Sequence, residues 1–212
     1  MPSIRHLFWD FDGTLYDSYP NLLHSVMAGL EDAGFAGRFS ETDVLRWIKV
    51  NVYHGIRVCA DQLGLPMETV LDAYLVHHRQ EKNFRPYDGL RECLQTLYDA
   101  GFRHYLYTHR DQSAVRQLQE DGLWHLFSDA VIKEDGFASK PAPDALNALM
   151  ARNALTPDQC AMIGDRDIDI DAGHNARMSG VLFDPDGFYQ GYPSEIQAQT
   201  MAELTQKLLS QP

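Results

Sequence analysis

Short apolar runs alternate with amphipathic stretches along most of this chain. The runs have the length of β-strands, and the stretches between the later runs repeat their apolar residues with the period of an α-helix. This alternation is typical of an α/β protein, in which a doubly wound parallel sheet carries helices on both faces. The expected strands are 4–11, 105–108, 130–132, 160–163 and 179–183, and the expected helices are 89–100, 113–121, 143–151, 168–176 and 201–209.

The alternation breaks between the first two expected strands. Residues 17–85 contain no strand-like run and are patterned as helices throughout, which makes the segment too long for a simple crossover. Ser40 is placed to cap one helix and Pro66 to begin another. The sequence therefore predicts an all-helical domain over 17–85, with helices 20–33, 41–49, 53–63 and 67–83, inserted into an α/β core domain formed by 1–16 and 86–212.

Composition argues against several classes of protein. The 212 residues are 44% apolar, enough for one good core and a small second module. No run approaches the roughly 20 apolar residues of a membrane span, and Asp10 comes before a signal-peptide apolar region can form. The three cysteines, Cys59, Cys93 and Cys160, lack metal or redox spacing, which predicts reduced, buried thiols. We expect a cytoplasmic protein without a membrane partner.

The charge balance indicates what kind of partner the chain binds. The formal net charge is -12, and no cluster of Lys and Arg is visible that could neutralise a nucleic-acid backbone. We therefore expect no nucleic-acid partner. A cation suits this surface better, although surplus acid also serves solubility.

The first acidic motif lies in FWDFDGTLYDS, where an apolar run carries Asp10 and Asp12 and then meets Gly13. Side chains alternate along a strand, so the two aspartates are expected to point the same way. Their mutual repulsion must be offset by a cation, a proton or a hydrogen-bond donor.

The second acidic motif is IGDRDIDIDAG, residues 163–173. An EF-hand calcium loop is excluded, because its required Gly and Glu positions hold Ile170 and Ala176. Asp165 is expected at a strand end and Asp169 one turn into the next helix, so that both face the same space.

Thr108 and Lys140 follow two further expected strands. In an open α/β sheet, ligands bind outside the carboxyl ends of the strands. The sequence therefore predicts that six residues scattered along the chain converge on one site: Asp10, Asp12, Thr108, Lys140, Asp165 and Asp169.

In order along the chain, the motifs DxDGT, a strand ending in Thr108, a Lys-Pro pair and GDxxxD resemble those of the haloacid dehalogenase superfamily of phosphohydrolases. The resemblance covers almost the whole chain and implies a Rossmann-like core. The helical insert resembles the cap of the subgroup that includes phosphoglycolate phosphatases and sugar-phosphate phosphatases.

This resemblance implies a mechanism for hydrolysis of a small phosphate ester. Asp10 would attack phosphorus to give an aspartyl phosphate, and Asp12 would protonate the leaving oxygen and then deprotonate water. Mg²⁺ would be held by the Asp10 carboxylate, the Asp12 backbone carbonyl and Asp165, while Asp169 orients a metal-bound water.

The resemblance also implies a phosphate cradle. Thr108 would hydrogen-bond a phosphoryl oxygen, and Lys140 would neutralise charge and keep Asp10 ionised. Backbone amides near Phe11 and His109 would complete the cradle. His109 stands where the family often has Asn, and with Arg110 it offers two extra cations towards the phosphate.

Other functions stay open at this stage. Superfamily dehalogenases lack an acid equivalent to Asp12, but sugar phosphomutases keep it, so a mutase is the main alternative. Mutases of this cap type tend to carry Glu-Asp where this chain has Gly164 and Asp165, which favours hydrolysis. A non-enzymatic phosphoreceiver or binding protein is the alternative from another class, although phosphoreceivers are shorter and lack the insert.

The insert is expected to select the substrate. The segment KVNVYHGIR, residues 49–57, places His54 and Arg57 between two expected helices. Either side chain could contact the part of the substrate that is not phosphate, or both could simply be solvated. The sequence leaves the identity of the ester and the oligomeric state open.

Overall fold

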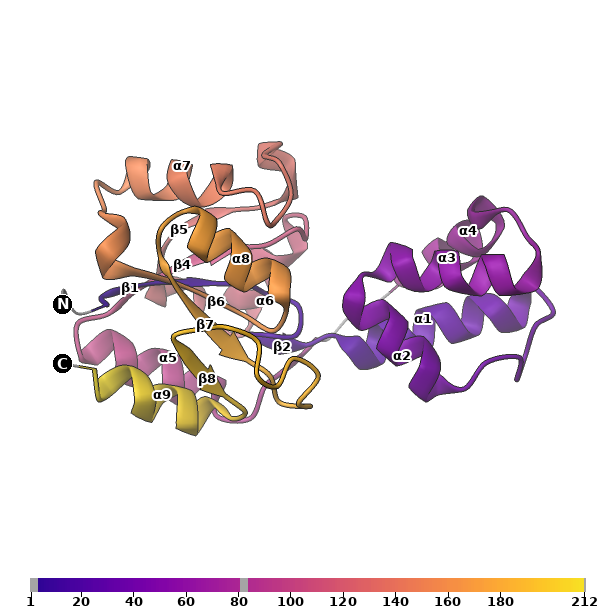
Figure 1. The fold of residues 1–212 in the computed structure, drawn as a ribbon, viewed down its shortest axis with the longest axis horizontal. Coiled ribbons are helices and arrows are strands. Elements are labelled where there is room, and N and C mark those ends of the chain that lie inside the picture. Colours follow the sequence, from indigo (N-terminus) through magenta and orange to yellow (C-terminus); the bar gives the residue numbers. More distant parts are fainter. Residues whose placement is uncertain (1–3, 81–83, 212) are drawn as a thin grey trace. The chain divides into compact units, whose positions relative to one another are not determined.

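The chain divides into two compact units in a computed structural model that describes residues 4–80 and 84–211 (Figure 1). One unit comprises Met1–Tyr16 and Pro86–Pro212, and the other comprises Asp17–Arg85. The connecting strands β2 (Tyr16–Asp17) and β3 (Arg85–Pro86) pair with each other. Neither was expected from the sequence, because a two-residue strand has no readable period.

The larger unit contains a six-stranded sheet among the described residues, and every neighbouring pair of strands is parallel. The prediction of a doubly wound α/β sheet is therefore confirmed. Its order is β5 (Phe127–Val131), β4 (Arg103–Tyr107), β1 (His6–Trp9), β6 (Cys160–Gly164), β7 (Ser179–Phe183) and β8 (Ile196–Ala198).

Strand β1 lies at the point where the strand order reverses. The chain proceeds outward on one side through β4 and β5 and on the other side through β6, β7 and β8. Trp9, the last residue of β1, is in register with Leu106 on β4 and Ile163 on β6. The residues that follow these three strands therefore meet at one edge of the sheet, at a topological switch point.

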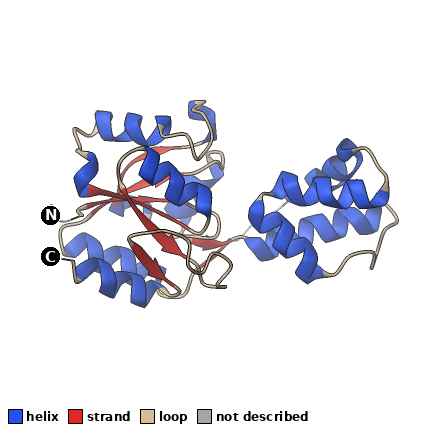
Figure 2. Cartoon of the chain, in the orientation of Figure 1, coloured by secondary structure: helices blue, strands red, loops and turns tan. Residues whose placement is uncertain are grey.

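Helices cover both faces of the sheet (Figure 1), with α5 (Leu90–Asp99) and α9 (Met201–Leu209) on one face and α7 (Asp144–Arg152) and α8 (Asp167–Asn175) on the other. Helix α6 (Ser113–Glu120) follows β4, and Figure 2 shows how helices and strands alternate. Short 3₁₀ turns lie at Trp124–Leu126, Lys133–Asp135 and Pro157–Gln159.

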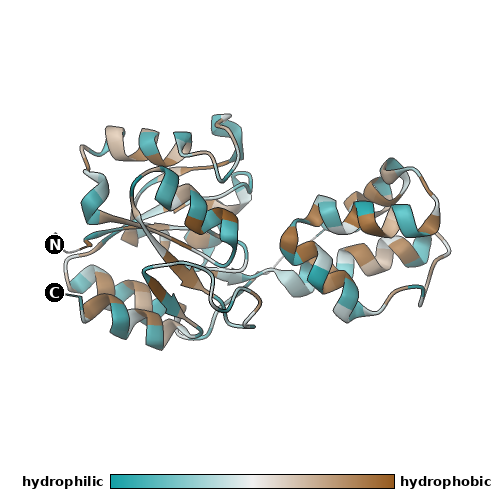
Figure 3. Cartoon of the chain, in the orientation of Figure 1, coloured by the Kyte–Doolittle hydropathy of each residue, from teal (hydrophilic) through white to brown (hydrophobic). Residues whose placement is uncertain are grey.

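The central strand is buried on both sides. Phe8 packs with Tyr105 and Met162 in an apolar cluster that includes residues of α7 and α8. The adjacent residues Leu7 and Trp9 are fully buried as well. The Trp9 indole N–H donates a hydrogen bond to Nδ1 of His104, and Nε2 of the same ring contacts the Leu94 carbonyl on α5. Such strands have nearly continuous apolar sequences. In Figure 3 much of β7 is accordingly brown, whereas the helices alternate between brown and teal.

The smaller unit consists of α1 (Tyr19–Asp32), α2 (Glu41–Val50), α3 (Val52–Leu63) and α4 (Met67–His78) in its described residues. It has its own apolar core, to which Val26, Ile48 and Ile56 belong. The Ser40 hydroxyl accepts a hydrogen bond from the Asp43 amide at 3.1 Å and caps α2, as the sequence predicted. Helix α4 ends at His78, so the expected continuation of the last helix is wrong at residues 79 and 80, and the rest of it, to residue 83, lies outside the described residues.

Most expected elements agree with the structure to within a few residues. Strand β8 was missed, because it is three residues long and follows a Gly- and Pro-rich stretch. Within the described residues, no helix has the length and apolar character needed to cross a membrane.

Candidate active site

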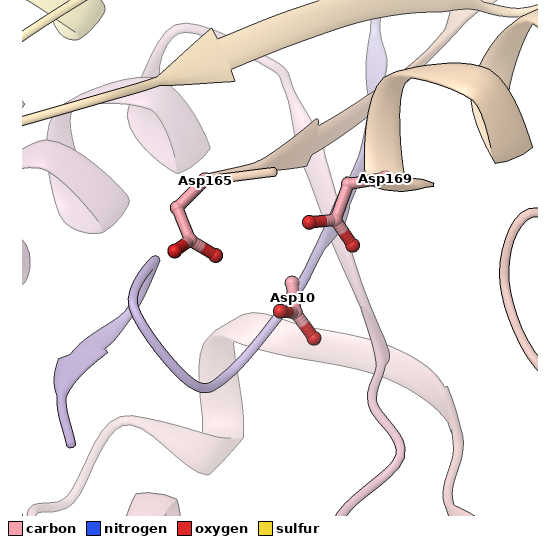
Figure 4. Close-up of side chains that lie close together, drawn as sticks. All are labelled: Asp10, Asp165 and Asp169. Atoms are coloured by element: carbon pink, nitrogen blue, oxygen red, sulfur yellow. The ribbon is translucent and has the colours of Figure 1, made fainter. Parts of the chain in front are cut away.

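Three carboxylates meet at the switch point. Asp10 directly follows β1, Asp165 directly follows β6, and Asp169 lies in the first turn of α8 (Figure 4). One oxygen from each lies within 4.8 Å of the others, and all three residues are buried. The Asp10 amide donates to the Ile163 carbonyl at 2.9 Å, which ties the end of β1 to β6.

Gly164 lets two of these carboxylates approach. A Cβ at position 164 would overlap the side chain of Asp169. The Asp169 carboxylate also accepts a hydrogen bond from the Arg166 amide at 3.1 Å, which holds it in the first turn of the helix. Glycine is therefore required at this position for Asp169 to fold back over the strand end.

Lys140 joins two of the carboxylates. Its Nζ lies 2.8 Å from Oδ1 of Asp10 and 2.7 Å from Oδ1 of Asp169. The same ammonium lies 4.6 Å from the centre of the Tyr107 ring, and the Lys140 side chain is fully buried. A buried ion pair of this kind is stable only if both partners are present.

The charges of this cluster are coupled. Burial raises the pKa of the Asp10 carboxyl, and the Lys140 ammonium only partly opposes that rise. Burial acts in the same direction on Asp169, but Lys140 and Arg166 overcome it and lower the pKa of that carboxyl. Burial alone would lower the pKa of Lys140, yet its two carboxylate partners hold it above the ordinary value. An additional cation near Asp10 would therefore stabilise the ionised form of its carboxyl group.

The cluster fits a divalent metal ion. Oδ2 of Asp10 is buried and accepts no hydrogen bond from the described residues. Asp165 offers a second oxygen within the cluster, whereas both oxygens of Asp169 have donors in Lys140 and the Arg166 amide. Asp10 is therefore better placed than Asp169 to bind a hard cation directly, and Asp165 lies beside it in the cluster.

Asp12 lies beside the cluster and has a different cationic partner. Its Oδ1 lies 2.6 Å from Nη2 of Arg110, and the guanidinium lies 5.5 Å from the centre of the Phe11 ring. Strand β1 ends at Trp9, so strict alternation does not extend to Asp10 and Asp12. The Asp12–Arg110 pair was not predicted; the only signal was that Arg110 stands two residues after Thr108.

Thr108 and His109 follow β4. Thr108 is buried, and its Oγ1 accepts a hydrogen bond from the Arg110 amide at 3.0 Å, which leaves the hydroxyl proton to be donated elsewhere. Nε2 of His109 accepts a hydrogen bond from the Lys140 amide at 3.0 Å. Partial burial and the charges of Lys140 and Arg166 lower the pKa of His109. The His109 ring is therefore neutral at neutral pH and positions the Lys140 loop, and it is not the additional cation that the sequence suggested.

His54 and Arg57 belong to the smaller unit. Both lie in α3, which starts at Val52 behind the N-cap Asn51, and both are exposed. They occupy the first turns of a helix and not a loop between helices.

Asp167 and Asp171, the other two aspartates of the motif 163–173, lie outside the carboxylate cluster. Asp167 accepts a hydrogen bond from the Ile168 amide at 2.8 Å, and Asp171 accepts one from the Tyr192 hydroxyl at 2.7 Å. Both are thus engaged in local structure.

Comparison with known proteins places these residues in a family context. A model of the haloacid dehalogenase-like hydrolase family matches residues 7–183. A phosphoglycolate phosphatase from Aliivibrio fischeri is 32% identical over 185 residues, which span 82% of this chain and 81% of that relative. Pyrophosphatase PpaX from Halalkalibacterium halodurans is 24% identical over 205 residues, which span 90% of this chain and 94% of that relative.

The fold also matches solved structures. YfnB, a HAD hydrolase from Bacillus subtilis that was solved bound to magnesium, superposes with a TM-score of 0.71 and 18% identity, over 97% of this chain and 99% of that chain. At this level of identity the likeness supports the fold alone.

Proposed function

Because the chain belongs to the haloacid dehalogenase-like hydrolase family, we propose that it is a phosphatase that hydrolyses a small phosphate monoester. The observation that carries this proposal is the buried pair of Asp10 and Lys140 at the switch point of the sheet, with one oxygen of Asp10 accepting no hydrogen bond from the described residues. The phosphate compounds named in the relatives, phosphoglycolate and pyrophosphate, are the first substrates to test.

Asp10 is the nucleophile in this proposal. Its carboxylate attacks phosphorus, the leaving group departs, and water then cleaves the aspartyl phosphate. Lys140 holds Asp10 in position through the 2.8 Å contact and offsets negative charge on the phosphoryl group. Thr108 donates its hydroxyl proton to a phosphoryl oxygen, and the backbone amides near Phe11 and His109 supply further donors.

Asp12 carries the proton in both steps. It protonates the leaving oxygen and then takes a proton from the attacking water. Its side chain is 28% exposed, against 4% for Asp10, so of the two carboxylates it is the more accessible to a leaving group.

We propose Mg²⁺ as the cofactor: Asp10, the Asp12 backbone carbonyl and Asp165 would hold it, and Asp169 would orient a water beside it. When bound, it would offset the charge of the phosphate and of the carboxylates that meet it. The donor set of buried carboxylate oxygens supports a hard cation over a soft one.

We further propose that residues 17–85 act as a cap that selects the leaving group, with His54 and Arg57 as contacts. The three buried, unbridged cysteines support a reducing compartment such as the cytoplasm.

The test is hydrolysis of a panel of small phosphate esters with and without Mg²⁺, for the wild type and for Asp10→Asn. The proposal predicts turnover that requires Mg²⁺ and is abolished in the variant. Undiminished turnover in Asp10→Asn, or in excess chelator, would refute it.

A further inference from the structure

The Asp12–Arg110 pair has a well-defined geometry. In addition to the 2.6 Å contact of Nη2 with Oδ1, Nε of Arg110 lies 3.2 Å from Oδ1 and 3.1 Å from Oδ2 of Asp12. The Arg110 side chain is only 11% exposed and stacks on Phe11, while its amide is fixed by Thr108. Asp12 and Phe11 thus position the guanidinium, and Thr108 fixes the backbone that carries it.

This position matters because of what Asp12 does in the proposed function. A proton can pass between Asp12 and the leaving oxygen only when the two are within hydrogen-bond distance, about 3 Å. The guanidinium contacts the same carboxylate. A group attached one or two bonds beyond the leaving oxygen can therefore contact Arg110 when it points towards the guanidinium.

Lys140 and Arg110 consequently lie on different sides of the reaction. Lys140 is engaged by Asp10 and Asp169, at the attacking side. Arg110 lies beside Asp12, at the leaving side. A guanidinium carries five donors in a planar fork that matches carboxylates and phosphates, so it can bind a second anion beside Asp12.

We propose that Arg110 binds an anionic group on the leaving part of the substrate, so that the enzyme prefers phosphate compounds whose leaving group carries its own negative charge. This inference rests on the proposed function, since it takes Asp12 to face the leaving oxygen. A leaving group with a carboxylate or a second phosphate gains a charge-assisted contact with Arg110. A neutral alkyl leaving group gains no such contact.

The experiment compares three substrates, phosphoglycolate, pyrophosphate and ethyl phosphate, in the wild type, Arg110→Gln and Arg110→Lys. The wild type is expected to prefer both anionic compounds. In Arg110→Gln, the ratio of kcat/KM for each anionic substrate to that for ethyl phosphate should fall by about tenfold or more, and Arg110→Lys should recover part of it. Arg152→Gln is the matched control, because Arg152 also pairs with an aspartate, with its Nε 3.1 Å from Oδ2 of Asp129, but on the surface.

A binding measurement complements the kinetics. Phosphoglycolate and ethyl phosphate are titrated calorimetrically into Asp10→Asn, with and without Arg110→Gln. The added substitution should weaken the binding of phosphoglycolate and leave the binding of ethyl phosphate unchanged. Circular dichroism establishes that each variant is folded, and Arg110→Lys takes the place of Arg110→Gln if the latter is not.

The outcomes separate the two claims. One outcome is that the wild type hydrolyses the substrates while Arg110→Gln lowers kcat/KM equally for anionic and neutral leaving groups, so that the ratio stays unchanged. In that case Arg110 does not bind the leaving group, and this inference is wrong. A wild type that prefers ethyl phosphate would contradict it as well. If the wild type hydrolyses none of the substrates, the proposed phosphatase function itself fails.

Discussion

The ammonium of Lys140 lies 2.8 Å from a carboxylate oxygen of Asp10, and both side chains are buried. The two residues are far apart in the sequence and meet only because β1 lies at the centre of the sheet. The pair offsets the cost of burying each charge, and it holds the proposed nucleophile at the switch point.

Removal of the lysine charge should therefore harm both activity and stability. We expect Lys140→Met to lower kcat/KM by about a hundredfold or more, because a phosphoryl group loses a charge partner. The free energy of unfolding should fall by about 3 kcal/mol, because two buried carboxylates lose their shared cation. Urea denaturation and steady-state kinetics measure the two effects. Lys207→Met, which removes an exposed pair with Glu203, is the control and should change stability by no more than about 1 kcal/mol.

Gly164→Ala should disrupt the site although it adds only one methyl group. The added Cβ would overlap Asp169, so that side chain must leave its place between Lys140 and the Arg166 amide. We expect a large loss of kcat and a lower melting temperature. Gly136→Ala is the control: Gly136 has a φ of +73° in open space, so alanine there should cost about 1 kcal/mol of stability without affecting kcat. Unchanged kcat in Gly164→Ala would contradict the assignment of Asp169 to the site.

His104 should make stability depend on pH. Its Nδ1 accepts the Trp9 indole proton at 3.0 Å, and its Nε2 lies 3.0 Å from the Leu94 carbonyl, which fits a neutral ring. Burial lowers the pKa of His104 to about 4. Between its ordinary pKa near 6.5 and about 4, the unfolded chain binds the proton and the folded protein does not, so stability falls as the pH falls through this window.

Because of His104, the free energy of unfolding should fall by about 3 kcal/mol as the pH falls from about 6.5 to about 4. Urea denaturation at a series of pH values should show this component in the wild type and not in His104→Gln. His125→Gln, which changes an exposed histidine, should keep it. An identical pH dependence in all three proteins would show that His104 is not the group responsible.

Substitution of two exposed side chains tests the hypothesis that residues 17–85 select the leaving group. Arg57→Ala and His54→Ala should change kcat/KM unequally across a panel of esters, by about tenfold for those they contact. Arg46→Ala is the control, because Arg46 is an exposed residue of α2 that pairs only weakly with Asp43, at 4.0 Å. If Arg57→Ala and His54→Ala leave kcat/KM unchanged for every ester, neither residue helps to select the substrate.

Five strands of the parallel sheet and the convergence of their ends could be predicted because buried parallel strands have continuous apolar sequences. The runs that contain Phe8 and Met162 are of this kind. Strand β8 could not be predicted, since three residues carry too little pattern. The acidic cluster was predictable because Asp10, Asp165 and Asp169 each follow a strand or open a helix.

Side-chain partners were much less accessible to sequence reasoning. Arg110 pairs with Asp12 across 98 positions, and nothing local in the sequence indicates that contact. The lowered pKa of His109 likewise depends on burial and on the charges of Lys140 and Arg166, which meet the ring only in the folded chain. Such pairings are set by tertiary packing.

The central claim is that Asp10 forms a covalent phosphoryl intermediate. The most direct measurement is acid quenching of the enzyme during turnover with Mg²⁺ and a hydrolysed ester, followed by proteolysis and mass spectrometry of the peptide that contains Asp10. We predict that this peptide gains the mass of one phosphoryl group in the wild type and not in Asp10→Asn. A phosphoryl group found on another residue, or rapid hydrolysis by Asp10→Asn, would contradict the account.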